Sequence, residues 1–482
     1  MAGLGSELRR LAKHSAIYGL GGLVSRILAV LLLPLYTSYL EPEDYGRVET
    51  LVALTAILVT ILRGGISSAF FRFYFDSKEA AARLRVVRTS FWFTMVSATA
   101  GLVAGLLLAD VVADLLSLGP NQDGLVRAAF VGLWAQMNLE QLTSLFRVEE
   151  RSVSFVVAAL VRVAITVATT VLLVVVLEQG ALGVVLGTAT GTLAVFLGLL
   201  VYRREQLGLA FDRALLREMN RFGLPLVPSA LALWTVNFSD RFFLAHLAGQ
   251  ADVGRYSLGV RIASAIVLLL VAFRTAWPAF AYSIDDDGEA RRTYGFVLTY
   301  LLFVGCWLAL GLGLLAPWLV QVLAPTNSDF WGGARVVAPL AFAGVAWGAY
   351  TVVAIGVGRA RRTQFNWVVT GAAAALNVAL NLLLIPPFGI MGAAIAMVSA
   401  FTAMFLGMTW HAQRIYPVPY QWRRVATATG TAVALTVLGK ALDLPLAAAI
   451  AVAAAYPLAL LPLGFYLPAE RARLRRLVPL SR

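Results

Sequence analysis

Nine charged side chains fall inside long apolar stretches of this 482-residue chain, and every basic one is an arginine. They are Arg26, Arg63, Arg162, Arg241, Arg261 and Arg274, together with Glu49, Glu140 and Asp240. Arginine stays protonated when it is buried and grips a phosphate through two parallel N–H donors, whereas a buried lysine can lose its charge. An excess of guanidinium over carboxylate in an apolar setting therefore favours an anionic ligand such as a phosphate.

The composition indicates that these charges lie within a membrane. Hydrophobic residues make up 60% of the chain, charged residues only 13%, and the mean hydropathy is +0.80. Soluble proteins carry roughly 25% charged residues. Apolar runs of about twenty residues, the length that crosses ~30 Å of hydrocarbon, recur along the whole chain. We therefore predict an all-α polytopic membrane protein, because backbone groups in lipid must be paired within the segment.

Fourteen spans can be delimited. Their approximate limits are 14–39, 45–69, 86–109, 125–147, 152–177, 180–202, 222–247, 253–277, 293–316, 331–357, 363–385, 389–411, 423–441 and 444–467. With the N-terminus in the cytoplasm, most Lys and Arg residues outside the spans fall on the cytoplasmic side. The net charge of +13 then needs no nucleic-acid partner. We expect a multi-pass protein of the plasma (inner) membrane, with both termini cytoplasmic and no removable signal peptide.

Two short motifs occur twice at almost the same separation. "EPEDYGRVE" at 41–49 and "GQADVGRYS" at 249–257 share the pattern D-x-G-R, and "QGALG" at 179–183 resembles "FGIMG" at 388–392. Repetition at one spacing predicts a duplicated six-helix unit, and an even number of helices gives both copies the same orientation in the membrane.

The predicted organisation follows from this duplication. It is an N-terminal lobe at 1–202, a basic cytoplasmic loop at 203–221, a C-terminal lobe at 222–412, and two added helices with a basic tail at 413–482. Two like lobes imply a central cleft, which polar groups that lipid would reject should line.

Arginines are the main candidates for the wall of this cleft. Arg26 lies midway along its span, and Arg261 shares a helix face with Ser257 and Ser264. Arg63 lies nearer the cytoplasm, so that its side chain reaching the interface is a serious alternative. We interpret Arg274 as an interfacial anchor.

The acids are candidates for coupling or gating. Glu140 and Arg162 lie at similar depths, and a structural pair between them is as good an interpretation as a role in substrate binding. Asp240 and Arg241 could pair with neighbours and gate the cleft. Glu49 is a further candidate for coupling the cycle to an ion.

One predicted span carries an amide stripe. Asn366, Thr370, Asn377 and Asn381 fall on a single helix face. Such a stripe either lines a cleft or joins helices through hydrogen bonds, and we keep both interpretations for Asn377 and Asn381.

Several kinds of chemistry are not indicated. The single cysteine, Cys306, excludes an internal disulfide, and His14, His246 and His411 are too dispersed to suggest a metal site. No phosphate-cradling G-x-x-x-x-G-K-[ST] motif occurs. We expect no cofactor, no metal and no enzymatic activity.

Three segments carry a family resemblance. "SRILAVLLLPLYTSYLEPEDYGRVE", "LPLVPSALALWTVNFSDRFFLAHLAGQADVGRYSLGVRIA" and "NVALNLLLIPPFGIMGAAIAMVSA" resemble, in order, segments of polysaccharide-transport flippases. These belong to the multidrug/oligosaccharidyl-lipid/polysaccharide (MOP) exporter superfamily. The resemblance covers about residues 10–412, and it implies a MATE-like fold of two six-helix lobes around a V-shaped cleft.

The resemblance also implies an activity. It is alternating access that carries a polyprenyl-(pyro)phosphate-linked oligosaccharide from the cytoplasmic to the outer leaflet for cell-surface polysaccharide biosynthesis. Related lipid II flippases carry arginines in the first, second and eighth spans, where Arg26, Arg63 and Arg261 lie. Expected partners are the lipid-linked glycan, membrane lipids, and a glycan polymerase and glycosyltransferases of the pathway, with the chain itself a monomer.

Other functions stay open. A lipid II-type precursor flippase and an ion-coupled multidrug antiporter share the fold. The drug-exporting relatives use a membrane carboxylate in the first lobe, whereas the first span here has an arginine and no acid. A membrane glycan polymerase or ligase would need a large outside loop, and the predicted outside loops are short. A non-transporting scaffold is a further alternative.

Overall fold

The computed structural model describes residues 32–468 and 470–471. Within these residues all regular secondary structure is helical, and no strand occurs. Contacts divide it into two compact units, Met1–Arg255 with Ala324–Asp329, and Tyr256–Leu323 with Phe330–Arg482. This division differs from the predicted lobe boundaries, because the seventh predicted span belongs to the first unit. The duplicated lobes remain a prediction.

Nine helices of the described part are long and apolar enough to cross a membrane. They span Pro42–Arg63, Ala80–Leu107, Ser152–Val176, Gly180–Tyr202, Arg213–Leu247, Asp287–Leu323, Ser328–Arg359, Asn366–Phe388 and Ile390–Ile415. Helices also occupy the fourth, eighth, thirteenth and fourteenth predicted spans, but they are more polar, interrupted or shorter. Most of the first predicted span lies outside the described residues. The all-helical membrane fold is confirmed, and the count of fourteen stays a prediction.

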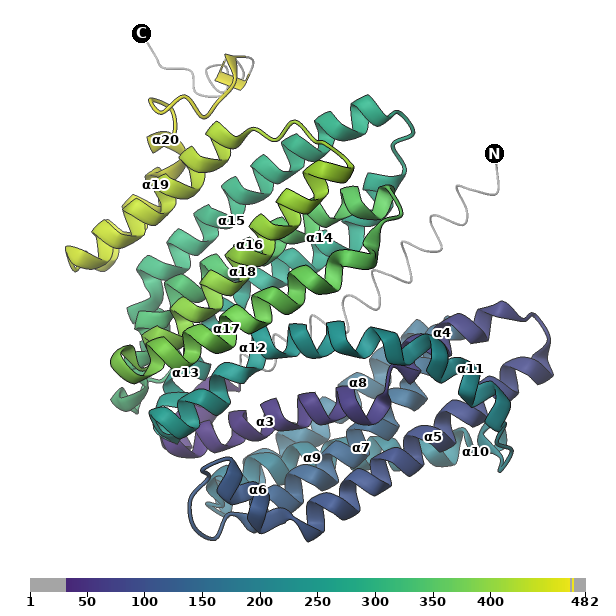
Figure 1. Cartoon of the computed structure of the whole chain (residues 1–482). Helices are drawn as coiled ribbons and strands as arrows, with labels where there is room; N and C mark the ends of the chain where they lie inside the picture. The colour runs from purple at the N-terminus through teal and green to yellow at the C-terminus, as the bar shows by residue number, and fades with distance from the viewer. Residues whose placement is uncertain (1–31, 469, 472–482) are drawn as a thin grey trace. The chain divides into compact units, whose positions relative to one another are not determined.

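The first unit is a bundle around one central helix. Its elements are α2 (Leu33–Tyr39), α3 (Pro42–Arg63), α4 (Ile66–Asp76), α5 (Ala80–Leu107), α6 (Ala109–Leu115), α7 (Asp123–Val148), α8 (Ser152–Val171) with a π-helical turn (Leu172–Val176), α9 (Gly180–Tyr202), α10 (Arg204–Leu207), α11 (Arg213–Gly223), a 3₁₀ turn (Leu224–Leu226) and α12 (Val227–Leu247). Helix α7 packs between α5 and α9 and also touches α3, α4 and α8 (Figure 1). Side chains of α7 can therefore meet those of several neighbours.

The second unit contains the remaining helices. They are α13 (Gln250–Ala263), which begins in the first unit, α14 (Ala265–Tyr282), α15 (Asp287–Leu323), a 3₁₀ turn (Ser328–Gly333), α16 (Ala334–Arg359), a 3₁₀ turn (Thr363–Phe365), α17 (Asn366–Phe388), α18 (Ile390–Ile415), α19 (Trp422–Ala441) and α20 (Leu446–Ala459). Helices α15, α16, α18 and α17 lie side by side in that order (Figure 1). The eighth predicted span is interrupted at Ser264, between α13 and α14.

A glycine pair ends α3 and so fixes the place of Arg63. Gly64 and Gly65 both have positive φ, at 52° and 78°, which glycine adopts without steric cost. A Cβ on Gly65 would lie 2.2 Å from the carbonyl oxygen of Gly223, so only a hydrogen fits there. The predicted span at 45–69 is therefore interrupted, and Arg63 is the last residue of its helix.

The two D-x-G-R turns make matching contacts. Arg47 donates to Asp44 at 2.7 Å and to the Leu118 carbonyl at 2.8 Å. Arg255 donates to Asp252 at 2.8 Å and to the Asp329 carbonyl at 2.8 Å. In both copies the arginine ties its own turn to a loop distant in the sequence.

The glycines of these two turns face each other's backbone. A Cβ on Gly46 would lie 1.8 Å from the Gln250 carbonyl oxygen, and one on Gly254 would lie 1.9 Å from the Pro42 carbonyl oxygen. Neither position can accept a side chain without moving the backbone. The close crossing explains why both motifs keep a glycine at this place.

The second motif pair is also built alike. Gly180 and Gly389 have φ of 53° and 54°, and each stands at the start of a helix, α9 or α18. In this left-handed conformation a side chain would be strained. The similar positive φ of the two glycines supports the predicted duplication from inside each unit.

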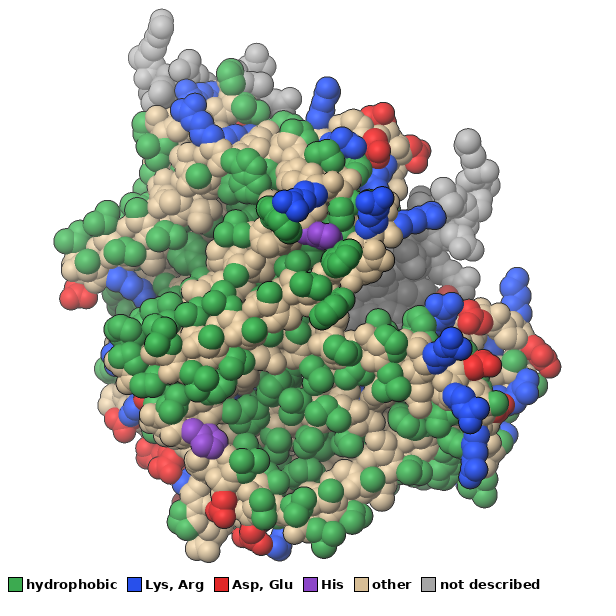
Figure 2. Space-filling model, in the orientation of Figure 1, with side chains coloured by type: hydrophobic (Ala, Val, Ile, Leu, Met, Phe, Trp, Pro, Cys, Tyr) green, Lys and Arg blue, Asp and Glu red, His purple; other side chains and the backbone are tan. Residues whose placement is uncertain are grey.

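Apolar side chains cover much of the molecular surface. On the face shown in Figure 2, hydrophobic residues spread over the flanks of the helices, and Lys, Arg, Asp and Glu side chains gather towards their ends. Large exposed apolar residues include Leu107, Val201 and Leu383, which are 77%, 65% and 68% exposed. This pattern is typical of helices that face lipid.

Candidate functional site

A polar cavity of about 280 Å³ lies within the first unit. It is lined by Arg63, Ser67, Phe71, Leu139, Glu140, Thr143, Ser144, Arg147, Phe155, Ala158, Ala159, Arg162 and Val195. Most of these residues come from the corner between α3 and α4 and from the facing sides of α7 and α8. Three predicted site residues, Arg63, Glu140 and Arg162, thus meet in one cavity.

Arg63 and Glu140 form an ion pair in this cavity. The Nη1 atom of Arg63 lies 2.7 Å from Oε2 of Glu140, and Nη2 donates to the Met137 carbonyl at 2.9 Å. The other carboxylate oxygen of Glu140 accepts from Gln136 at 2.9 Å. The Arg63 side chain is 13% exposed and that of Glu140 43% exposed. The predicted alternative, a structural pair of Glu140 with Arg162, is wrong, because Arg63 holds this carboxylate.

Arg147 and Arg162 line the same cavity without an acidic partner among the described residues. The guanidinium of Arg147 lies over the ring of Phe155, 5.0 Å from its centroid. Arg162 is half-buried on α8, and no described carboxylate pairs with it. Stacking on an aromatic face leaves the edge donors of a guanidinium available to a ligand.

The charges of the cavity wall do not cancel. Three guanidinium groups face one carboxylate, so the described wall carries an excess of two positive charges. Thr143 and Ser144 both donate to the Glu140 carbonyl, at 3.1 and 2.8 Å, so their hydroxyls offer the cavity acceptor rather than donor positions. Donors for an anion must come from the arginines, and a phosphate or diphosphate matches their charge.

A second charged cluster lies between α3 and α12 of the same unit. Nε of Arg241 is 3.7 Å from Oε2 of Glu49, and its Nη1 donates to Oδ1 of Asp240 at 3.1 Å. All three side chains are no more than 5% exposed. Three of the four predicted coupling or gating residues are therefore together, whereas the fourth, Glu140, belongs to the polar cavity.

The other predicted residues lie elsewhere. Arg26 is outside the described residues. Arg261 is half-buried on α13 in the second unit. Asn377 and Asn381 are fully buried on α17, where the Asn381 amide donates to the Asn377 side chain at 3.1 Å. Arg274 lies over the Trp347 ring at 4.1 Å.

Sequence reasoning missed Arg147. The predicted fourth span ends at this residue, and Arg147 was not counted among the charges inside the membrane, but α7 continues to Val148. The signal was present in the spacing, because Arg147 lies seven residues after Glu140 and therefore on the same helix face. Phe155, which supports its guanidinium, has the same hydrophobic surroundings as its neighbours and gave no distinguishing signal.

Comparison with known proteins identifies the family. The family described as "Polysaccharide biosynthesis protein" matches residues 11–283. Protein 1 of the Lsg locus of Haemophilus influenzae is 24% identical over 285 residues, which are 56% of this chain and 65% of that protein. The chain thus spans somewhat less than two thirds of this relative's length.

Solved structures show the same fold. The lipid II flippase MurJ, in an inward closed conformation, matches with a TM-score of 0.76 at 12% identity, over 96% of this chain and 99% of that one. An inward-facing multidrug resistance MATE family transporter of the MOP superfamily matches with a TM-score of 0.69 at 15% identity, over 81% and 98%. A MOP superfamily transporter from Pyrococcus furiosus, whose structure was described as having a binding pocket of reverse polarity, matches with a TM-score of 0.59 at 14% identity, over 87% and 96%.

Proposed function

Because the chain belongs to the polysaccharide biosynthesis protein family, we propose that it is a flippase for a polyprenyl-(pyro)phosphate-linked oligosaccharide. It carries this lipid from the cytoplasmic to the outer leaflet of the plasma membrane for cell-surface polysaccharide biosynthesis. Alternating access moves the substrate, and no covalent step is involved. The chain acts as a transporter and not as an enzyme.

The charge of the polar cavity is the observation that carries this proposal. Arg63, Arg147 and Arg162 outnumber Glu140 three to one. Holding charge inside a membrane costs at least ~2.5–3.5 kcal/mol per residue, so an unbalanced positive wall indicates a site for an anion. The phosphate or diphosphate that joins glycan to prenyl chain supplies this anion.

Arg147 and Arg162, which have no acidic partner among the described residues, are the best candidates to bind the phosphate or diphosphate. Glu140 already neutralises Arg63 at 2.7 Å. Arg147 and Arg162 have no such counter-ion among the described residues, so they can bind a phosphate without first breaking an ion pair. Arg26 and Arg261 remain further candidates on the basis of the family resemblance.

The proposed layout has fourteen spans, with both termini in the cytoplasm. Two six-helix lobes at 1–202 and 222–412 are joined by the loop at 203–221, and 413–482 adds two helices and a tail. Support comes from the matching contacts of the two D-x-G-R turns and the similar positive φ of Gly180 and Gly389. In this scheme the two lobes are related by an axis along the membrane normal and rock against each other.

The buried cluster is the proposed coupling or gating element. Two carboxylates, Glu49 and Asp240, both contact the guanidinium of Arg241. Taking up a proton or a cation at one of these carboxylates would change the charge of the cluster. Movement of α3 relative to α12 would change that balance, which gives the cluster a means of linking an ion to the transport cycle.

Two other functions are distinguished by the substrate. A lipid II-type precursor flippase would need the same diphosphate-binding site but would carry a different glycan. A multidrug antiporter for organic cations would need a cavity in which carboxylates predominate, and the described cavity has the opposite balance. A glycan polymerase or ligase is not supported by the family or by the fold of the neighbours.

Transport by reconstituted protein tests the proposal. The purified full chain is placed in vesicles with a fluorescent undecaprenyl-diphosphate oligosaccharide, and flipping is measured by accessibility to an added glycosidase. Replacing Arg162→Ala, and separately Arg147→Ala, should slow flipping about tenfold, since each removes one charge-assisted contact of ~1.5–3 kcal/mol. Arg127→Ala is the matched control, because Arg127 is half exposed and paired with Asp123.

Three outcomes distinguish the proposals. Slower flipping in both cavity variants, with the control unchanged, supports an anion-binding site in the polar cavity. Unchanged flipping in both variants rejects this binding site but leaves the flippase activity supported. If the wild-type chain does not flip the glycan lipid but transports a cationic dye, the antiporter replaces the flippase.

A further inference from the structure

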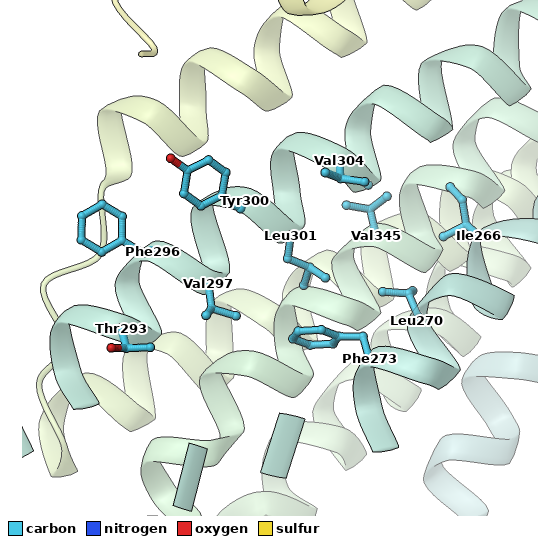
Figure 3. A pocket seen from close by; sticks show the side chains of 11 residues that line it. Ile266, Leu270, Phe273, Thr293, Phe296, Val297, Tyr300, Leu301, Val304 and Val345 are labelled. Atoms are coloured by element: carbon cyan, nitrogen blue, oxygen red, sulfur yellow. The ribbon is translucent and has the colours of Figure 1, made fainter. Parts of the chain in front are cut away.

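An apolar groove of about 430 Å³ lies within the second unit. It is lined by Ile266, Leu270, Phe273, Thr293, Phe296, Val297, Tyr300, Leu301, Val304, Gly305 and Val345. Helices α14 and α15 both pack against α16 but make few contacts with each other, which leaves a gap between them. Figure 3 shows Leu270 and Phe273 of α14 across this gap from Val297 and Leu301 of α15.

The groove has the length and surface of a site for a hydrocarbon chain. From Thr293 to Gly305 the rise along α15 is about 18 Å, slightly more than one leaflet of a ~30 Å hydrocarbon core. The floor is apolar and buried, because Ile266 and Leu270 are 1% and 2% exposed. At the Gly305 end, α15 packs closely on α16, since a Cβ on Gly305 would lie 3.1 Å from Val345.

The groove is lined by two rows of side chains along α15. One row is Phe296, Tyr300 and Val304, and the other is Thr293, Val297, Leu301 and Gly305. Members of each row are four residues apart, so each row follows one strip of the helix surface.

Each row begins with a charged residue. One turn before Phe296 stands Arg292, and one turn before Thr293 stands Glu289. Both residues are exposed, and neither forms an ion pair with a described residue, including with the other. Helical side chains point towards the N-terminus of their helix, so both charges extend beyond the Thr293 end of the groove.

We propose that this groove holds one acyl chain of a phosphatidylethanolamine-type phospholipid. The phosphate of the headgroup pairs with Arg292, the ammonium group pairs with Glu289, and the chain lies along Val297 and Leu301. A zwitterionic headgroup matches the cation of Arg292 and the anion of Glu289, which lie at the same end of the groove. An anionic headgroup would leave Glu289 facing a negative charge.

The acidic character of the neighbouring turn strengthens this choice of lipid. Asp285 and Asp286 precede α15 and are exposed, and Asp287 is held by Arg359 at 2.8 Å. Residues 285–292 carry four carboxylates and two arginines, so the net charge of this end of the helix favours an ammonium group over a headgroup with only negative charge. In the proposed orientation this end faces the cytoplasm, so the lipid belongs to the inner leaflet.

Lipid retention measured by native mass spectrometry tests the proposal. The full chain is equilibrated in mixed micelles with equal amounts of phosphatidylethanolamine, phosphatidylglycerol and undecaprenyl phosphate, and bound lipid is counted. Leu301→Trp fills the groove and should lower retained phosphatidylethanolamine about tenfold, because the chain loses its apolar contact area. Val437→Trp is the control, since Val437 is an exposed apolar residue of α19.

A change of headgroup preference gives a second measurement that a folding defect would not produce. Glu289→Lys places two cations at the Thr293 end of the groove and should shift preference from phosphatidylethanolamine towards phosphatidylglycerol by about threefold or more, the size of one or two exposed ion pairs. Arg292→Gln should lower retention of both phospholipids.

Several results would overturn the proposal. One is equal retention by wild type and Leu301→Trp. Another is preferential retention of phosphatidylglycerol by the wild-type chain. Preferential, Leu301-sensitive retention of undecaprenyl phosphate would make the groove a substrate site instead. None of these measurements requires transport, so their outcome is independent of the proposed flippase activity.

Discussion

Arg63 and Glu140 join the end of α3 to the middle of α7 through a contact of 2.7 Å. The pair occupies the polar cavity, and the glycines after Arg63 place its guanidinium there. Glu140 acts as an internal anion for Arg63. A phosphate that uses Arg63 must therefore displace Glu140, whereas Arg147 and Arg162 require no displacement.

The energy of this pair can be measured with a double-mutant cycle of Arg63→Ala and Glu140→Gln. Because Glu140 is 43% exposed, solvent screens the pair, and we expect a coupling energy of about 1 kcal/mol in the free energy of unfolding. Thermal melting in detergent gives the four stabilities. A coupling near zero would mean that the pair does not hold α3 to α7.

The same cycle has a distinct expectation for transport. Glu140→Gln alone should leave flipping unchanged or raise it, because it frees Arg63 for the substrate. A large loss of flipping in a normally folded Glu140→Gln chain would instead give Glu140 a part in ion coupling.

The sequence alone was sufficient to predict the class of fold. Composition and the length of the apolar runs predict a helical membrane protein, and the pattern of the two D-x-G-R motifs predicts that they are equivalent, in agreement with their matching contacts. These features are local, because they depend on residues close together in the chain. The resemblance of three segments also predicted the family correctly.

Partnerships between distant residues could not be predicted. Helix periodicity places Glu140 on a face of α7, but it does not say whether Arg63 or Arg162 lies opposite. That choice depends on the turn at Gly64 and Gly65, which ends α3. Similarly, nothing local to Arg241 indicates that Glu49, far away in the chain, is its partner.

The close contact between the two D-x-G-R turns predicts that adding a single methyl group there lowers stability strongly. Gly46→Ala places a Cβ 1.8 Å from the Gln250 carbonyl oxygen, and relief requires a shift of backbone. We expect a loss of at least ~1–3 kcal/mol in the free energy of unfolding, as for overpacked cores. Gly254→Ala should behave in the same way.

Gly124→Ala is the matched control for these variants. It also lies in a helix, but no atom lies within 4 Å of its added Cβ. This variant should melt at the wild-type temperature or slightly above, because alanine favours a helix more than glycine does. Equal melting temperatures for Gly46→Ala, Gly254→Ala and Gly124→Ala would show that the two D-x-G-R turns can move apart without loss of stability.

Arg241 is expected to stabilise the buried cluster strongly. In Arg241→Ala, Glu49 and Asp240 lose a cation that contacts both of them, while they stay almost completely buried. Removing one partner of a buried ionic cluster costs about 3–5 kcal/mol. The amount of folded protein recovered from membranes should fall sharply, and Arg127→Ala should leave it unchanged. Adding Glu49→Gln to Arg241→Ala should restore part of the yield, since one buried negative charge is removed.

The C-terminal segment is expected to detach at acid pH. Glu470 lies outside the spans, receives a hydrogen bond from Tyr300, accepts from the Leu467 N–H at 2.8 Å and pairs with Arg424 at 2.9 Å. Burial alone would raise the pKa of Glu470, but these hydrogen bonds and the Arg424 charge outweigh it and hold the pKa below its ordinary value. The carboxylate therefore stabilises docking at neutral pH, and this stabilisation is lost as pH falls from about 4.3, the usual value for Glu, through the lowered pKa.

A nitroxide label at Leu467→Cys would report this detachment, because Leu467 is 36% exposed and the native Cys306 is buried. The label should be immobile at pH 7 and become mobile below about pH 4, the region in which Glu titrates. With Glu470→Gln added, mobility should already be raised at pH 7 and should not change with pH, since the titrating group is gone. In the labelled chain that retains Glu470, equal mobility at both pH values would mean that the segment does not dock on Arg424 in solution. An identical acid transition in the Glu470→Gln chain would assign the titration to another group.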